Sequence, residues 1–115
     1  MSNDYKSVLV VGAGPVGLVA TASLISEGIP VKLIETTADL AQDLRASTFH
    51  PPTLDFLDKL GIADALVEQG LICKNWQFRD RNSGVVASFD LSLLTGETKF
   101  PFRLQCEQWK LTKAL

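Results

Sequence analysis

The sequence predicts an α/β fold that opens with a strand, a glycine-rich turn, a helix and a second strand. Residues 6–11 are a short apolar run rich in valine, which is typical of a parallel-sheet strand buried on both faces. Gly12 ends this run, and apolar residues then recur at helical spacing from Pro15 to Glu27. Residues 29–35 form a second apolar strand that ends in Glu35. This order predicts a Rossmann-like βαβ unit with a parallel sheet.

Length and composition bound the remaining possibilities. The 115 residues predict one domain, 1–115, with a single core. The hydrophobic fraction of 46% and the charged fraction of 21% are those of a globular protein, not of a disordered chain. Because 11 basic and 13 acidic residues give a net charge of −2, we expect no basic surface for nucleic acid. Cys73 and Cys106 lie far apart and His50 is the only histidine, so we expect free thiols in a reducing, cytoplasmic compartment and no metal site.

One segment raises the alternative of a membrane span or a secretory signal. Residues 8–25 carry no charge and are long enough to cross a bilayer, and residues 20–22 have the small-x-small form of a cleavage site. Against this, Asp4 precedes the segment, three glycines and a proline interrupt it, and the following residues continue the βαβ unit. We therefore expect no membrane association.

The turn between the first strand and the helix reads Gly-Ala-Gly-Pro-Val-Gly, a G-x-G-x-x-G pattern. Its first glycine permits a tight turn, its second lets the backbone approach a pyrophosphate, and its third lets the helix pack close to the sheet. The phosphates would lie at the helix N-terminus, where unpaired N–H groups and the helix dipole favour negative charge. The residues expected to contact a dinucleotide here are Gly12, Gly14, Pro15, Val16 and Gly17.

Glu35 supplies the second part of this pattern. It follows Gly17 at close to the expected spacing of about 20 residues and would accept hydrogen bonds from ribose hydroxyls. A carboxylate there would repel a 2′-phosphate, which favours a plain adenosine ribose over NADP. The motif does not distinguish FAD from NAD. The alternative is that these glycines serve turn and packing alone and that Glu35 is a solvated charge.

The rest of the chain is predicted to add helices and a β-hairpin. Residues 36–47 are a polar loop with a short turn around 40–44. Residues 50–53 introduce a helix that ends at Gly61, and a shorter helix follows at 62–69.

A period-two pattern begins at Leu71 and predicts an antiparallel hairpin. Its turn lies at 80–84 and its second strand at 85–89, and Trp76 and Phe78 are expected in the core rather than on a base-stacking surface. The last expected elements are a loop at 91–98, an extended segment at 99–104 and a helix at 106–115.

The acidic residues of the 50–61 helix are expected to be structural. Asp55 and Lys59 are spaced for an ion pair on a solvated face. Asp55 and Asp58 do not form a predicted acid–base pair, because nothing in the sequence desolvates either carboxylate. No residue of the chain is proposed as catalytic.

Several stretches resemble the N-terminal part of the FAD-dependent aromatic hydroxylases, the single-component flavoprotein monooxygenases of the para-hydroxybenzoate and phenol hydroxylase kind. The resemblance spans nearly the whole chain. The matching stretches are residues 8–18, Glu35, Arg45-Ala46, residues 52–57, Leu60-Gly61 and Leu104-Gln105.

The resemblance implies a role for each matching position. The glycine turn would hold the FAD pyrophosphate and Glu35 the adenosine ribose. Arg45 would reach the phosphate and ribitol region, where a guanidinium fork suits phosphate oxygens, and Gln105 would also contact the cofactor. A solvated Arg45 and a helix-capping Gln105 are the alternatives. In the complete enzyme NAD(P)H would reduce FAD, and the reduced flavin would use O2 to hydroxylate a small aromatic substrate.

The sequence also departs from that family. The family's later Asp-Gly and Gly-Asp stretches and its substrate pocket are not found in these 115 residues. We therefore expect an FAD-binding domain that is incomplete relative to the family, with little turnover by itself and with homo-oligomerisation left open. The other functions considered are a non-catalytic dinucleotide-binding or interaction module and an NAD-binding piece of a dehydrogenase.

Overall fold

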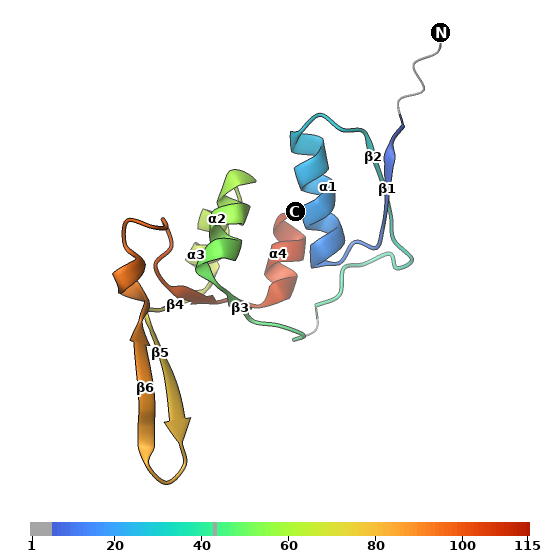
Figure 1. Ribbon diagram of the computed structural model, residues 1–115. Coiled ribbons are helices and arrows are strands. Elements are labelled where there is room, and N and C mark those ends of the chain that lie inside the picture. The colour runs from blue at the N-terminus through green and yellow to red at the C-terminus, as the bar shows by residue number, and fades with distance from the viewer. Residues whose placement is uncertain (1–5, 43) are drawn as a thin grey trace. The chain divides into compact units, whose positions relative to one another are not determined.

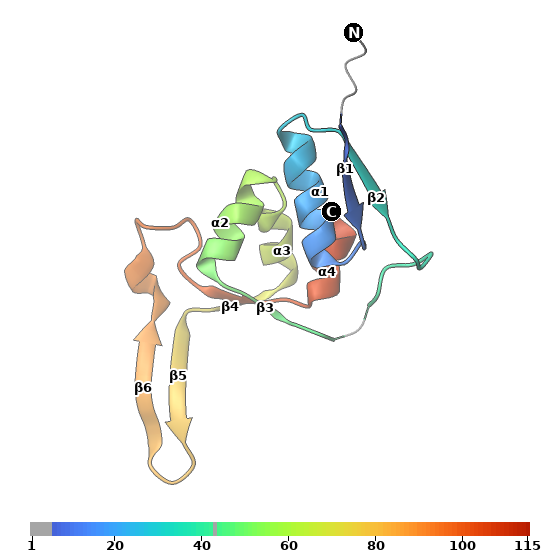
Figure 2. The ribbon, with the colours of Figure 1, turned by 45° about the vertical axis from the view of Figure 1, so that its right-hand side comes forward.

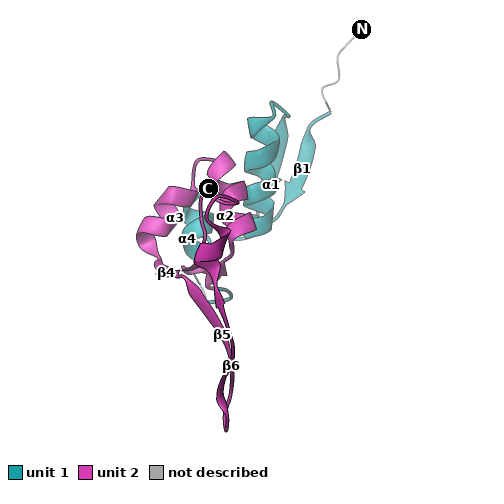
Figure 3. Cartoon of the chain, turned by 60° about the vertical axis from the view of Figure 1, so that its left-hand side comes forward, with its two compact units in different colours: residues 1–46, 108–115 teal, residues 47–107 magenta. Residues whose placement is uncertain are grey.

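The computed structural model describes residues 6–42 and 44–115 (Figure 1). Contacts within the chain divide it into two units, which Figure 3 distinguishes by colour. The first unit comprises residues 1–46 and 108–115, and the second comprises residues 47–107.

The first unit contains the predicted βαβ arrangement. Strands β1 (Val8–Val11) and β2 (Val31–Ile34) are parallel, with Val8 opposite Val31. Helix α1 (Pro15–Ser26) connects them and packs against both, as Figure 2 shows. Helix α4 (Gln108–Ala114) contacts α1. The strand–helix–strand prediction is confirmed, and each boundary lies at most two residues inside the predicted one.

Backbone hydrogen bonds fix both ends of this unit. The N–H of Val8 donates to the carbonyl of Pro30 at 2.9 Å, and the N–H of Gly12 donates to the carbonyl of Ile34 at 2.7 Å. Gly28, at φ +73°, ends α1 in the left-handed conformation that glycine adopts without strain, and its N–H donates to Ile25. The two strands are therefore held in register along their whole length.

The expectation that the first strand is buried on both faces is wrong for this chain. Leu9 and Val11 are 58% and 72% exposed, and Ile34 on β2 is 51% exposed. Within the described residues the sheet consists of β1 and β2 alone, and α1 covers one part of it. An apolar composition identifies the strand, but burial needs neighbours that two strands and one helix do not supply.

The second unit contains the buried core. Helices α2 (Pro51–Lys59) and α3 (Ala63–Gln69) pack together, and β7 (Arg103–Gln105) lies between β3 (Thr48–Phe49) and β4 (Leu71–Cys73) in an antiparallel sheet. The fully or nearly buried apolar side chains of this unit are Phe49, Leu54, Leu57, Ala63, Leu66, Phe100, Leu104 and Cys106.

Gly70 shows how closely this sheet approaches the helices. A Cβ at Gly70 would lie 2.7 Å from Cδ1 of Leu104 and 2.8 Å from the carbonyl oxygen of Gln105. The glycine that ends α3 is therefore also the residue that lets β7 pass beside it.

The sequence did not indicate this three-stranded sheet. Residues 48–49 were assigned to no element, and residues 71–73 were expected to begin the hairpin, whereas both pair with β7. Strands of two or three residues are too short to show an alternating pattern. The 91–98 loop likewise contains a short 3-10 helix, η1 (Leu91–Leu94). The expected turn at 40–44 includes Asp43, which lies outside the described residues, and its neighbours in that stretch have no regular structure.

The predicted hairpin is present as β5 (Asn75–Asp80) and β6 (Gly84–Asp90), with Trp76 opposite Phe89. The rings of Trp76, Phe78 and Phe89 contact one another, with centroids 4.9–6.2 Å apart. The placement of Trp76 and Phe78 in the core is wrong, since they are 43% and 53% exposed. Alternation correctly places the rings on one face, but it does not say what covers that face.

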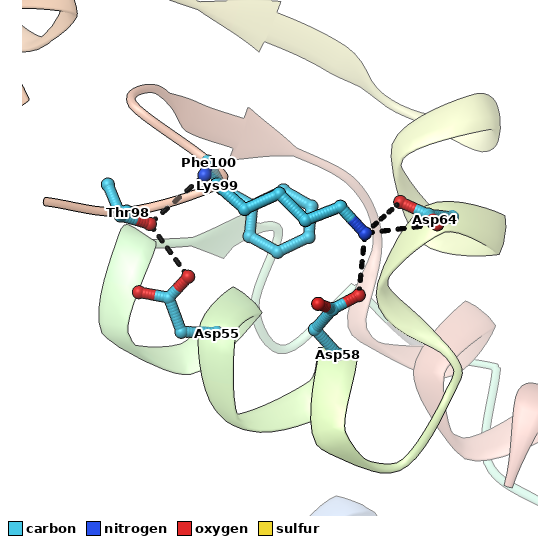
Figure 4. Close-up of polar contacts among 6 residues, drawn as sticks. All are labelled: Asp55, Asp58, Asp64, Thr98, Lys99 and Phe100. Atoms are coloured by element: carbon cyan, nitrogen blue, oxygen red, sulfur yellow. Dashed lines mark hydrogen bonds and ion pairs between the residues drawn. The ribbon is translucent and has the colours of Figure 1, made fainter. Parts of the chain in front are cut away.

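Polar contacts bind residues 98–100 to α2 and α3 (Figure 4). Nζ of Lys99 lies 2.9 Å from Asp58 and 3.2 Å from Asp64, and these two carboxylates raise the pKa of Lys99. Oγ1 of Thr98 donates to Asp55 at 2.7 Å. Asp55 and Asp58 thus hold a loop to the helices, consistent with a structural role, and the partner of Asp55 is Thr98 rather than the expected Lys59.

Two further sequence expectations concern cysteines and membranes. Cys73 and Cys106 are free thiols, as expected, and Cys106 is buried. No helix within residues 6–42 and 44–115 has the length and apolar character needed to cross a membrane.

Replacing Leu54 with alanine is expected to lower the free energy of unfolding by about 2–5 kcal/mol, because it removes a fully buried side chain and leaves a cavity. Leu93→Ala is the matched control: Leu93 is 83% exposed, and its loss should cost less than about 0.5 kcal/mol. Urea unfolding followed by tryptophan fluorescence measures both. Equal effects of the two substitutions would contradict this placement of the core.

Candidate dinucleotide site

The glycine turn leads from β1 into α1. Gly12 has φ +101°, a conformation that side chains rarely adopt, so the chain turns sharply there. Gly14 is the N-cap residue of α1 and Pro15 occupies the first helical position, where its missing N–H costs nothing. Val16, in the first turn of the helix, is 81% exposed. The first N–H groups of the helix have no acceptor within it, and Gly14 has no side chain to cap them.

The three glycines of the motif have different surroundings. A Cβ at Gly17 would overlap the carbonyl oxygen of Gly12, so α1 approaches the turn as closely as a backbone allows. A Cβ at Gly14 would meet no atom of the described chain within 4 Å. The start of α1 therefore presents its N–H groups beside open space, which is the arrangement that an incoming phosphate needs.

A pocket of the first unit adjoins this helix start. Ala13, Gly14, Pro15 and Arg45 line it, so the structure brings Arg45 to the glycine turn. The first turn of α1 contains no acidic residue that would compete with an anion. The remaining lining residues are Ala41 and, from α4, Gln108, Trp109 and Thr112.

Sequence reasoning missed the α4 residues of this pocket. The pattern at 106–115 indicates a helix but gives no sign that the helix packs beside α1.

Gln105 belongs to the second unit, where it lies on β7 and its Nε2 donates to Oγ of Ser47 at 2.8 Å. Its side chain is thus held by a hydrogen bond to the residue that precedes β3, not by a helix-capping contact.

Glu35 directly follows β2 and faces the glycine turn. Its Oε2 accepts a hydrogen bond from the N–H of Ala13 at 2.7 Å, and its Oε1 accepts from Thr36 and Thr37. These hydrogen bonds, the one from Ala13 first, lower the pKa of Glu35 to about 2. The carboxylate is therefore ionised at neutral pH and fixed in position. Val11, Gly12 and Ile34 join Glu35 and Thr36 in lining a shallow apolar groove of about 190 Å³.

These features fit a dinucleotide. The open backbone at Gly14 and the helix N-terminus suit a pyrophosphate, the Arg45 guanidinium suits phosphate oxygens, and the apolar groove beside the Glu35 carboxylate suits a nucleoside. All of them lie in the first unit.

Comparison with known proteins agrees with this geometry. A family model described as "FAD binding domain" matches residues 5–115. The chain is 34% identical to the 6-hydroxy-3-succinoylpyridine 3-monooxygenase of Pseudomonas putida, over 96% of this chain and 28% of that protein. It is 33% identical to the para-nitrophenol 4-monooxygenase of a Pseudomonas species, over 84% of this chain and 24% of that protein. The chain thus spans about a quarter of the length of these relatives.

Solved structures give the same result. The crystal structure of p-nitrophenol 4-monooxygenase from Pseudomonas putida matches 95% of this chain and 28% of its own, with a TM-score of 0.85 and 29% identity. Aklavinone-11 hydroxylase, solved with FAD and aklavinone, matches 99% of this chain and 23% of its own, with a TM-score of 0.73 and 28% identity.

Replacing Gly17 with alanine is expected to lower the free energy of unfolding by about 1–3 kcal/mol, because the new Cβ overlaps a backbone oxygen that cannot move aside. This cost exceeds the gain of up to about 1 kcal/mol that alanine brings to a helix. Gly14→Ala is the matched control and should cost less than about 1 kcal/mol, since its Cβ meets open space. Urea unfolding compares them, and a G17A protein as stable as wild type would rule out the close approach.

Acid is expected to destabilise the wild-type protein more than Glu35→Gln. The pKa of Glu35 falls from 4.5 to about 2 on folding, so its stabilising effect is complete above pH 4.5 and disappears as the pH falls toward 2. The amide of the variant does not titrate. Urea midpoints measured from pH 7 to pH 2.5 give the comparison, and parallel curves for the two proteins would show that these hydrogen bonds do not hold the carboxylate.

Proposed function

The chain belongs to the FAD-binding domain family, and we propose that it supplies the nucleotide-binding part of a monooxygenase that hydroxylates an aromatic compound with NAD(P)H and O2. The observation that carries this proposal is the start of α1, where N–H groups beside Gly14 lie open to a phosphate. Glu35 lies next to the same turn, bonded to Ala13. Phosphate and ribose recognition are therefore available on one surface of one unit.

The candidate site residues of the first unit each have a defined task in this proposal. The helix N-terminus and the turn of Gly12 to Gly17 bind the pyrophosphate oxygens. Arg45, on the pocket beside that turn, pairs with a phosphate and extends the cationic surroundings toward the ribitol. Glu35 accepts a hydrogen bond from the adenosine ribose. Bound FAD supplies the redox chemistry with oxygen, while the protein binds and orients it.

Gln105 belongs to the second unit, and its contact with the cofactor stays a prediction from the family resemblance. One N–H of its carboxamide donates to Ser47, and the amide group has a further donor and an acceptor to offer a ligand. Its place on β7, held between two neighbouring strands, gives that side chain a rigid base.

The substrate class follows from the relatives. Their names specify a hydroxylated succinoylpyridine, para-nitrophenol and pentachlorophenol, each of which contains an aromatic ring. We propose an aromatic substrate of this kind for the whole protein.

The free thiols of Cys73 and Cys106 support a reducing, cytoplasmic compartment.

Binding of FAD tests the proposal. Titration of the chain with FAD should quench flavin fluorescence, and Arg45→Met should weaken binding by about tenfold or more, because a charge-assisted hydrogen bond to phosphate is lost. Lys32→Met is the matched control, since Lys32 is an exposed cation of the same unit on β2 and should leave the dissociation constant within about twofold. Tight binding of NAD with no uptake of FAD would contradict the proposal.

A further inference from the structure

The two carboxylate oxygens of Glu35 are used differently. Four donors surround Oε1: the N–H groups of Thr36 (2.7 Å) and Thr37 (3.0 Å), and the hydroxyls of Thr36 (3.0 Å) and Thr37 (3.2 Å). Oε2 has one donor within the described part of the chain, the N–H of Ala13 at 2.7 Å. Since a carboxylate oxygen offers about two lone pairs, Oε1 is saturated and Oε2 retains one acceptor position.

The two threonines are not equivalent either. The hydroxyl of Thr37 lies closer to the carbonyl oxygen of Asp39 (3.0 Å) than to Oε1 of Glu35 (3.2 Å), and it has one hydrogen to donate. The hydroxyl of Thr36 donates to Glu35 at 3.0 Å and also belongs to a residue that lines the apolar groove. Thr36 is therefore the side chain that fixes the rotation of the carboxylate.

We propose that Thr36 is a positioning residue: its hydroxyl holds Oε1 of Glu35 so that Oε2 alone receives a ribose hydroxyl of the bound nucleotide. This inference rests on the proposed function, because it assigns the nucleoside of FAD to the groove beside Glu35. Thr36 does not touch the nucleotide's hydroxyl itself in this arrangement. It acts by fixing the plane of the carboxylate, so that the oxygen bonded to the N–H of Ala13 keeps its unused acceptor position for the ligand.

The charged surroundings of Glu35 do not compete with this arrangement. β1 and α1, which pack around the end of β2, contain no titratable side chain. Lys32 on β2 and Asp39 in the following loop are the titratable residues near Glu35 in sequence, and neither is among the causes of its lowered pKa. Those causes are hydrogen bonds from Ala13, Thr37 and Thr36, so removal of the Thr36 hydroxyl raises the pKa of Glu35 toward its ordinary value.

Calorimetric titration with ADP tests the inference on three variants. Thr36→Val keeps the shape of the side chain and removes the hydroxyl, and we expect ADP binding about three- to tenfold weaker at pH 7. Thr36→Ser restores the hydroxyl and should bind within about twofold of wild type. Thr37→Val is the matched control and should also bind within about twofold. Equal loss in T36V and T36S, equal loss in T36V and T37V, or no loss in T36V would each overturn the inference.

The pH dependence separates positioning from a general structural effect. The ratio of the T36V and wild-type dissociation constants cancels the titration of ADP itself. We expect this ratio to rise as the pH falls from 4.5 toward 2.5, because the pKa of Glu35, about 2 in wild type, is higher in the variant without exceeding its ordinary value of 4.5. A ratio that does not change with pH would overturn the inference.

A measurement without nucleotide distinguishes this inference from the proposed function. The carbon-13 resonance of the Glu35 carboxyl reports its pKa directly, and the pKa should rise in T36V while T36S and T37V stay near wild type. An unchanged value in T36V overturns the positioning role whether or not the chain binds ADP. Conversely, a wild-type chain that takes up neither ADP nor FAD overturns the proposed function, and with it the role for Thr36 in binding.

Discussion

The close approach of α1 to the glycine turn is the constraint on which the nucleotide site depends. Because Gly17 has no Cβ, the helix meets the carbonyl of Gly12 directly. That contact sets where α1 begins, and hence where its unpaired N–H groups point. It also places Gly14 beside open space and brings the turn within reach of Glu35, whose carboxylate accepts from Ala13. The absence of a Cβ at Gly17 thus positions both the helix start, where we propose that the phosphates bind, and the turn beside Glu35, where we propose that the ribose binds.

The two units rely on different sources of stability. The second unit encloses leucines that are 0–1% exposed, such as Leu54 and Leu57, between helices and a sheet. The first unit is held by parallel pairing and by hydrogen bonds at the glycine turn, while Leu9, Val11 and Ile34 remain largely exposed. Since a ligand that binds only the folded state stabilises it, nucleotide binding has its largest effect on the unit with the smaller core.

The sequence predicted the elements whose pattern is local. β1, α1 and β2 follow from apolar runs separated by glycine, and the hairpin follows from alternation around Asp80 to Gly84. It did not predict β3 and β4, whose pairing with β7 depends on residues far along the chain. For the same reason it missed Gln108, Trp109 and Thr112 beside Arg45. The hydrogen bond from Thr36 to Glu35 joins neighbouring residues, but no sequence pattern indicated it.

The position of β7 in the second unit has a consequence for how the chain folds. β7 is the central strand of its sheet, yet it is the last of the three in sequence, and Gln105 bonds to Ser47 across 58 positions. Contacts of such long range are slow to form, because the intervening loop must close first. During synthesis, α2 and α3 are complete long before Leu104 emerges to fill the space beside Gly70. The three-stranded sheet therefore cannot be completed until β7 has been synthesised.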